Sequence, residues 1–176
     1  MNRKQLEHAI RAACDVSGDH ELYIFGSQAI VGQYPDAHQQ LRQSIEVDVS
    51  PKNRPETIDN IDGALGENSL FHQTHGFYVH GVSLETAALP SGWRKRTHKV
   101  QETMDKNNIG WCIEAHDLAA SKLIAFREKD RVFVRRLLLE SMVDADKLIK
   151  RIKLIETEEE LKEQAQLWVE RIAAEL

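Results

Sequence analysis

The chain has 176 residues, of which 41% are hydrophobic and 29% are charged, and its formal net charge is −5 at pH 7. This length suits one α/β domain with a helical extension, and the acidic balance argues against a protein that coats nucleic acid over its whole surface. No apolar run approaches the ~20 residues that a membrane span needs. Because the first residues begin an amphipathic pattern rather than a signal-peptide core, we expect a cytoplasmic protein with no membrane partner.

The first part of the chain is expected to alternate helices and strands. Apolar residues at helical spacing predict a helix over residues 3–16, which Gly18 ends. A short apolar strand follows, turns at Gly26 and continues into a helix that Pro35 halts. By the same patterns we expect strands over residues 45–50, 77–83 and 110–114 and a helix over residues 56–65.

Two residues at the first strand-to-helix turn predict a phosphate-binding corner. Gly26 allows a ligand to approach the backbone closely, because glycine carries no Cβ atom. A helix that begins at Ser27 presents unpaired N–H groups and the positive end of its dipole. Ser27 can cap this helix and also contact an anion. We therefore expect Gly26 and Ser27 to bind phosphate oxygens.

An acidic pair on the next strand predicts a metal site. Glu46 and Asp48 alternate with Ile45, Val47 and Val49, so the two carboxylates project from one face and the three apolar side chains from the other. Carboxylates at positions i and i+2 lie about 7 Å apart at Cα, near enough to converge on one cation. Mg²⁺ prefers oxygen ligands, so we expect Glu46 and Asp48 to bind Mg²⁺ or Mn²⁺.

These four residues resemble the motif of the DNA polymerase β superfamily of nucleotidyltransferases, in which Gly-Ser at a strand-to-helix turn precedes an acidic-x-acidic strand. The resemblance implies a polymerase-β-like α/β fold with a mixed sheet, a divalent metal and a nucleoside triphosphate (NTP) as substrate. The sequence departs from the motif in the eighteen residues between Ser27 and Glu46, which is a long gap, and in Glu46, where Asp is commoner.

His80 stands where many such transferases carry a third carboxylate. One interpretation is a partly buried strand histidine. The other is a substitute for the group that helps to deprotonate the attacking hydroxyl. A basic run follows over residues 94–99 and predicts either a solvated face or a local basic surface.

From His116 onward the pattern is helical to the end. The expected organisation is therefore an α/β core over residues 1–115 and a helical region over residues 116–176 packed on that core. Thr157 and Glu160 predict a capping box for the last helix. Cys14 and Cys112 lie far apart without metal-ligand spacing, so we expect reduced packing residues.

One helical segment of this region carries further candidate site residues. Lys122 has apolar neighbours one turn away in each direction, so its amine must either reach water or meet an anion. Lys129 follows seven residues later, nearly on the same face of a continuous helix. Asp130 is expected to pair with Arg127 or to cap the following helix.

The arrangement K-x-x-A-x-R-x-K-D over residues 122–130 resembles the downstream motif of the abortive-infection, type IV toxin group of nucleotidyltransferases. The resemblance implies that Lys122 and Asp130 assist nucleotide binding and catalysis and that Arg127 or Lys129 orients the nucleotide or acceptor. It also implies transfer to a tRNA end or a protein hydroxyl, and a cognate antitoxin as partner.

Three functions are compatible with this sequence. The first is a metal-dependent nucleotidyltransferase with Glu46, Asp48, Lys122 and Asp130 as catalytic residues. The second is a catalytically degenerate relative that binds nucleotide, RNA or a partner protein, which His80 and the long gap favour. The third is a metal-dependent nuclease, which is less favoured because a Gly-Ser phosphate site suits a triphosphate better than a phosphodiester.

Overall fold

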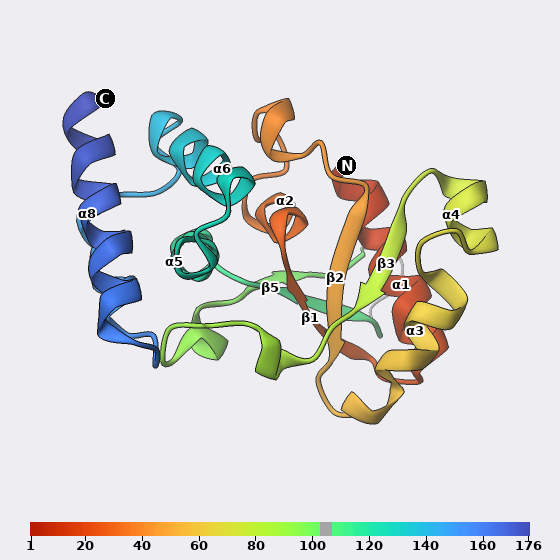
Figure 1. The fold of residues 1–176 in the computed structure, drawn as a ribbon. Helices are drawn as coiled ribbons and strands as arrows, with labels where there is room; N and C mark the ends of the chain where they lie inside the picture. The colour runs from red at the N-terminus through yellow and green to blue at the C-terminus, as the bar shows by residue number, and fades with distance from the viewer. Residues whose placement is uncertain (103–106) are drawn as a thin grey trace. The chain divides into compact units, whose positions relative to one another are not determined.

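Figure 1 shows the computed structural model of the protein, which describes residues 1–102 and 107–176. The chain divides into two compact units. The first unit comprises residues 1–86 and 97–113 and contains the sheet, and the second comprises residues 87–96 and 114–176 and is helical. The expected division into an α/β core over residues 1–115 and a helical region over residues 116–176 packed on that core remains a prediction.

The first unit is built on a five-stranded mixed sheet. Its strands stand in the order β3-β2-β1-β5-β4 (Figure 1). Neighbours β1 and β5, and β2 and β3, run parallel, whereas β1 and β2, and β4 and β5, run antiparallel. This mixed sheet confirms the predicted α/β class. The strands are β1 (Glu21–Phe25), β2 (Glu46–Pro51), β3 (Tyr78–Gly81), β4 (His98–Val100) and β5 (Ile109–Cys112).

Helix α1 (Arg3–Ser17) forms where the sequence predicts it and packs against the sheet and α3. Asn2 and Gln5 make a capping box at its start, and Gly18 ends it in the left-handed region with φ 65°. Its buried face includes Cys14, and neither Cys14 nor the buried Cys112 forms a disulfide. The other α-helices of this unit are α2 (Ile30–Gln33), α3 (Ile58–Leu65) and α4 (Leu70–His75).

The second unit contains the helices of the C-terminal part, which confirms that this part is helical. They are α5 (Ala115–Ala125), α6 (Glu128–Leu139), α7 (Ala145–Lys153) and α8 (Glu159–Glu175). Helix α5 packs on α6, α7 and α8, and its Leu118 and Leu123 are buried with Leu137, Leu148 and Val169 of the other helices. Within the described residues, no helix combines the length and the apolar character that crossing a membrane requires.

Several local expectations were wrong. The helix expected across residues 117–130 breaks at Phe126, which has φ 51°, so α5 and α6 are separate helices. Helix α8 has Glu158 as N-cap with no side-chain capping bond, so the expected Thr157–Glu160 capping box does not form. Ile45 precedes β2 and is 49% exposed, so it does not join the buried face of that strand.

Two elements were not expected at all. Helix α4 has no buried residue, so its sequence carries no apolar stripe from which a helix could be predicted. The Ser69 N-cap and Gly76 set its two ends. Strand β4 lies at the sheet edge and has only three residues, two of them His98 and Lys99, and polar or charged side chains are usual on edge strands.

Candidate metal centre

Three side chains of the first unit converge beside β2 and β3. The parallel register places Asp48 opposite His80 and Glu46 opposite Tyr78, and directly paired residues share one face of a sheet. His80 Nδ1 lies 3.2 Å from Glu46 Oε1 and 3.2 Å from Asp48 Oδ1. The three potential ligand atoms all lie within 4.8 Å of one another. Glu46, Asp48 and His80 can therefore hold one metal ion.

This cluster is open to solutes and strongly negative. The side chains of His80, Glu46 and Asp48 are 45%, 37% and 25% exposed. Burial raises the pKa of the Tyr78 hydroxyl, and the charges of Glu46, Glu67 and Asp48 raise it further. A hydroxyl that holds its proton against this field donates to Glu46 rather than competing with it for a cation.

Gly26 forms the wall of the cluster next to Asp48. Its φ of +61° is favourable mainly for glycine, and a Cβ atom built there would lie 2.0 Å from Asp48 Oδ2. Phe25, the preceding residue, is paired with Asp48 across the antiparallel β1–β2 ladder. The carboxylate of Asp48 therefore points at the glycine-serine corner, which is the geometry that the predicted site requires.

The corner differs from the expected helix start. Ser27 begins a 3-10 turn, η1 (Ser27–Ala29), which continues into the four-residue α2. The residue at the N-cap of η1 is Gly26, and no side chain caps this turn, so the expected cap by Ser27 is wrong. So short a helical segment adds little dipole. The Asp48 carboxylate fills the space beside Gly26, so a phosphate here would depend chiefly on the half-buried Ser27 hydroxyl.

The downstream residues form a second cluster, within the second unit. Lys122 Nζ lies 3.0 Å from Asp130 Oδ1 and 4.8 Å from the centroid of the Phe133 ring. Arg127 Nε lies 2.6 Å from Asp130 Oδ2, which confirms the expected pairing of Asp130 with Arg127. The break at Phe126 lets α6 return toward α5, so residues eight apart in the chain form an ion pair.

The side chains of this cluster differ in how far they are buried. The side chain of Asp130 is 1% exposed and that of Lys122 is 14% exposed, whereas that of Arg127 is 60% exposed. Burial raises the pKa of Asp130, but the hydrogen bond from Arg127 and the charge of Lys122 outweigh it, so the pKa is lowered overall. Lys129 is exposed on α6 and does not share a helix face with Lys122, so that expectation is wrong.

Sequence reasoning missed two buried ionic groups in the second unit. Asp117, fully buried, pairs with Arg96 at 2.7 Å and with Arg151 at 3.0 Å. Arg96 belongs to the basic run over residues 94–99, so at least this member does not lie on a solvated face. Its guanidinium also donates to the Ser91 carbonyl within the same segment, and its pair with Asp117 ties this segment to α5. The partners lie far apart in sequence, so no local signal indicates them.

The other buried group lies at the N-terminus of α5. Glu114 is its N-cap, and the carboxylate accepts from the backbone N–H groups of His116 and Asp117. His116 Nδ1 lies 2.6 Å and Lys147 Nζ 3.3 Å from Glu114 Oε1. Burial raises the pKa of Glu114, but the His116 hydrogen bond and the positive charges beside it lower it overall, to about 2. These contacts connect the start of α5 to α7.

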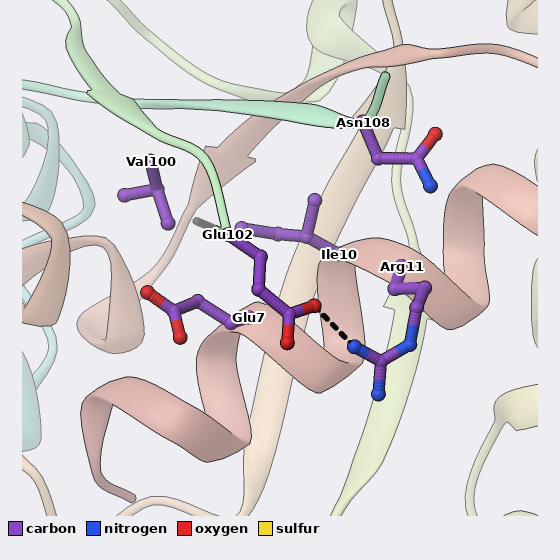
Figure 2. Close-up of a pocket in the computed structure, with 6 residues that line it drawn as sticks. All are labelled: Glu7, Ile10, Arg11, Val100, Glu102 and Asn108. Atoms are coloured by element: carbon purple, nitrogen blue, oxygen red, sulfur yellow. Dashed lines mark hydrogen bonds and ion pairs between the residues drawn. The ribbon is translucent and has the colours of Figure 1, made fainter. Parts of the chain in front are cut away.

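The first unit also has a small pocket (Figure 2), and no residue of the candidate metal centre lines it. Helix α1 and the segments around β4 and β5 form its walls, and Arg11 and Glu102 make an ion pair across it. The lining residues are Glu7, Ile10, Arg11, Val100, Glu102 and Asn108, which include no predicted site residue.

The chain matches a model of a known protein family. The family model described as "Nucleotidyltransferase of unknown function (DUF6036)" matches residues 4–173, which is nearly the whole chain. No curated protein and no solved structure matches. The matched range includes both the acidic pair of β2 and the Lys122–Asp130 pair.

Proposed function

The chain belongs to the family of nucleotidyltransferases of unknown function, and on that premise we propose that it moves a nucleoside monophosphate from an NTP to an RNA or protein hydroxyl. One observation carries the proposal. The Asp48 carboxylate lies against Gly26 and beside Glu46 and His80, so a cation ligand set adjoins the strand-to-turn corner.

Glu46 and Asp48 are proposed to hold one or two divalent ions, Mg²⁺ or Mn²⁺. Such an ion, when bound, screens the charge of the triphosphate that repels an incoming hydroxyl. Gly26 and Ser27 are proposed to bind phosphate oxygens on the sides of the turn that the Asp48 carboxylate does not fill, and Ser27 donates its hydroxyl to them. Asp48 is rigidly placed for its role, because the backbone of Gly26 and the β1–β2 ladder fix it from two sides.

Lys122, Arg127 and Lys129 are proposed to bind the nucleotide, and Lys122 and Asp130 are proposed to assist catalysis. The support is the resemblance to the downstream motif of the type IV toxin nucleotidyltransferases. In the second unit, Asp130 holds the Lys122 ammonium at a fixed place, as a residue that neutralises charge on a phosphate needs. The exposed side chains of Arg127 and Lys129 can reach a solute, so they suit orientation of the nucleotide or acceptor.

The same resemblance suggests a toxin. In that case the acceptor is a tRNA end or a protein hydroxyl, and a cognate antitoxin neutralises the protein. The alternative is a catalytically degenerate relative that binds nucleotide, RNA or a partner protein. His80 at the place of a third carboxylate favours this alternative, because that group usually helps to activate the acceptor.

Label transfer distinguishes the two functions. The protein is incubated with each α-labelled NTP, a divalent metal and total cellular RNA or protein, and Asp48→Asn is run in parallel. We expect label on RNA or protein with the wild type and none with Asp48→Asn. The matched control is Asp15→Asn, an exposed carboxylate on α1, which should transfer as the wild type does.

Nucleotide binding is measured so that an absence of label transfer can be interpreted. Thermal shifts with NTP and metal are measured for the wild type and for Asp48→Asn. Metal-dependent binding without transfer supports the binding module, whereas absence of both binding and transfer contradicts the proposed nucleotidyltransferase.

A further inference from the structure

We propose that His80 is a metal ligand and that it makes the centre select first-row transition-metal ions over Mg²⁺. The inference deepens the proposed function, since it concerns the same site, and it rests on that function. It assigns to Glu46, Asp48 and His80 a specific class of cation rather than any divalent ion.

The contacts of the imidazole support this assignment. His80 Nδ1 faces a carboxylate oxygen of Glu46 and one of Asp48, each at 3.2 Å. Nδ1 carries at most one hydrogen, so a neutral ring satisfies two acceptors poorly and a lone pair at Nδ1 repels both. A cation enclosed by the three atoms removes this conflict. A separation of 3.2 Å also matches neighbouring ligands on an octahedral ion with bonds of roughly 2.1 to 2.3 Å.

The chemistry of the ligands then decides which ion is preferred. Mg²⁺ dehydrates reluctantly and takes oxygen ligands, so a third carboxylate at this position would favour it. An imidazole supplies one less negative charge and a nitrogen donor, which first-row transition metals accept readily. The replacement of a carboxylate by His80 therefore weakens Mg²⁺ binding relative to Mn²⁺ and Co²⁺.

The backbone that carries His80 is fixed, so the ligand is preorganised. The N–H of Gly81 donates to Asp62 Oδ1 on α3 at 2.8 Å. A Cβ atom on Gly81 would lie 2.6 Å from the Ile58 carbonyl oxygen, so β3 and α3 are in close contact at this point. Glu46 is oriented from the other side by its hydrogen bond with Tyr78. Such supporting contacts commonly tune metal affinity.

Titration of the metal-free protein tests the proposal without using activity. Dissociation constants for Mg²⁺, Mn²⁺ and Co²⁺ are measured by calorimetry, together with the visible spectrum of bound Co²⁺. We expect affinity to rise from Mg²⁺ through Mn²⁺ to Co²⁺, with Co²⁺ about 100-fold tighter than Mg²⁺. In His80→Asp this ratio should fall at least about tenfold and the Co²⁺ spectrum should change, because an oxygen replaces the nitrogen ligand.

Two controls separate this site from other histidines. His80→Asn should lose the preference for Co²⁺, whereas His20→Asn should keep it, because His20 lies at the other end of β1 from Gly26. The rings of His8 and His75, with centroids 4.5 Å apart, offer two imidazoles outside the proposed centre. The titrations are therefore repeated in the His75→Asn background, where the ratio of affinities should be unchanged.

Three results would overturn the proposal. They are an unchanged ratio in both His80 variants, Mg²⁺ binding at least as tight as Co²⁺ binding in the wild type, or metal binding that survives Glu46→Gln unaltered. Label transfer is measured separately, so its loss contradicts the proposed function and leaves the metal preference intact. Metal-free thermal unfolding shows whether each variant is folded before it is titrated.

Discussion

The Asp48 carboxylate occupies the space that a side chain on Gly26 would need, since a Cβ atom there would lie 2.0 Å from Asp48 Oδ2. Glycine at this position serves two purposes. It permits a backbone with φ +61°, and it leaves room for the acidic group on the neighbouring strand. A substitution therefore affects both the stability of the turn and the position of a proposed metal ligand.

We expect Gly26→Ala to lower the free energy of unfolding by about 1–3 kcal/mol, because φ 61° with ψ −171° is a backbone conformation essentially restricted to glycine. It should also weaken divalent-metal binding at least about tenfold, because the methyl group displaces Asp48. Urea unfolding and metal titration measure the two effects. Gly63→Ala is the control: it lies within α3 with open space around it, and it should stabilise the protein by about 0.5–1 kcal/mol. Unchanged metal affinity in Gly26→Ala would show that Asp48 does not need this space.

The sequence was sufficient to predict the acidic pair and the corner because both depend on local rules. Alternation along β2 places Glu46 and Asp48 on one face, and a glycine at the end of an apolar strand predicts a turn. The contact of His80 with both carboxylates depends instead on the parallel register of β2 and β3. That register joins residues about thirty positions apart, so periodicity within either strand does not indicate it.

The second unit shows why the remaining contacts could not be predicted. An unbroken apolar pattern indicated one helix through Phe126, and the left-handed residue that separates α5 from α6 leaves no trace in that pattern. The pairing of Lys122 with Asp130 depends on this break. Similarly, Asp117 meets Arg96 and Arg151, which come from two segments remote from it in the chain.

Asp130 offers a test of the buried ion pair. Asp130→Asn removes the charge opposite Lys122, whose side chain is only 14% exposed, so the free energy of unfolding should fall by about 3–5 kcal/mol. Adding Lys122→Met should recover part of this loss, because the double variant leaves no unpaired buried charge. Arg127→Gln should cost less than about 1 kcal/mol, since Arg127 is largely exposed. Strictly additive effects of the first two substitutions would contradict a coupled pair.

His8 should make the first unit sensitive to mild acid. Its ring contacts His75 and Phe71, with centroids at 4.5 and 5.4 Å, and burial, followed by the charge of His75, lowers the pKa of His8 below 6.5. The unfolded chain therefore binds a proton at higher pH than the folded chain. Stability is full above pH 6.5 and decreases as the pH falls from 6.5 toward the folded pKa, by less than about 1 kcal/mol at this partly exposed site.

The measurement compares unfolding free energies at pH 7.5 and pH 5.0 in the wild type and in His8→Phe. We expect the variant to lose less stability on acidification, because phenylalanine keeps the ring contacts and does not titrate. His20→Asn should behave as the wild type does. Equal losses in the wild type and His8→Phe would assign the acid sensitivity to other groups.

The lowered pKa of Glu114 predicts a second loss of stability, at more acidic pH and in the second unit. The pKa of this buried N-cap is about 2 in the folded chain, against an ordinary value of 4.5. A lowered carboxyl pKa stabilises the fold above pH 4.5, and that contribution is lost as the pH falls from 4.5 to about 2. At roughly 1.4 kcal/mol per pKa unit, the charge contributes on the order of 3 kcal/mol at neutral pH.

Glu114→Gln isolates this charge, because the amide oxygen can still accept from the N–H groups of His116 and Asp117. We expect the variant to be about 3 kcal/mol less stable than the wild type at pH 7 and only about 1 kcal/mol less stable at pH 2.5, by urea unfolding at each pH. Glu163→Gln, at an exposed position of α8, should change stability little at either pH. If Glu114→Gln lost as much stability at pH 2.5 as at pH 7, the loss would come from packing or capping, and the ionised carboxylate would not be what holds α5 to Lys147 of α7.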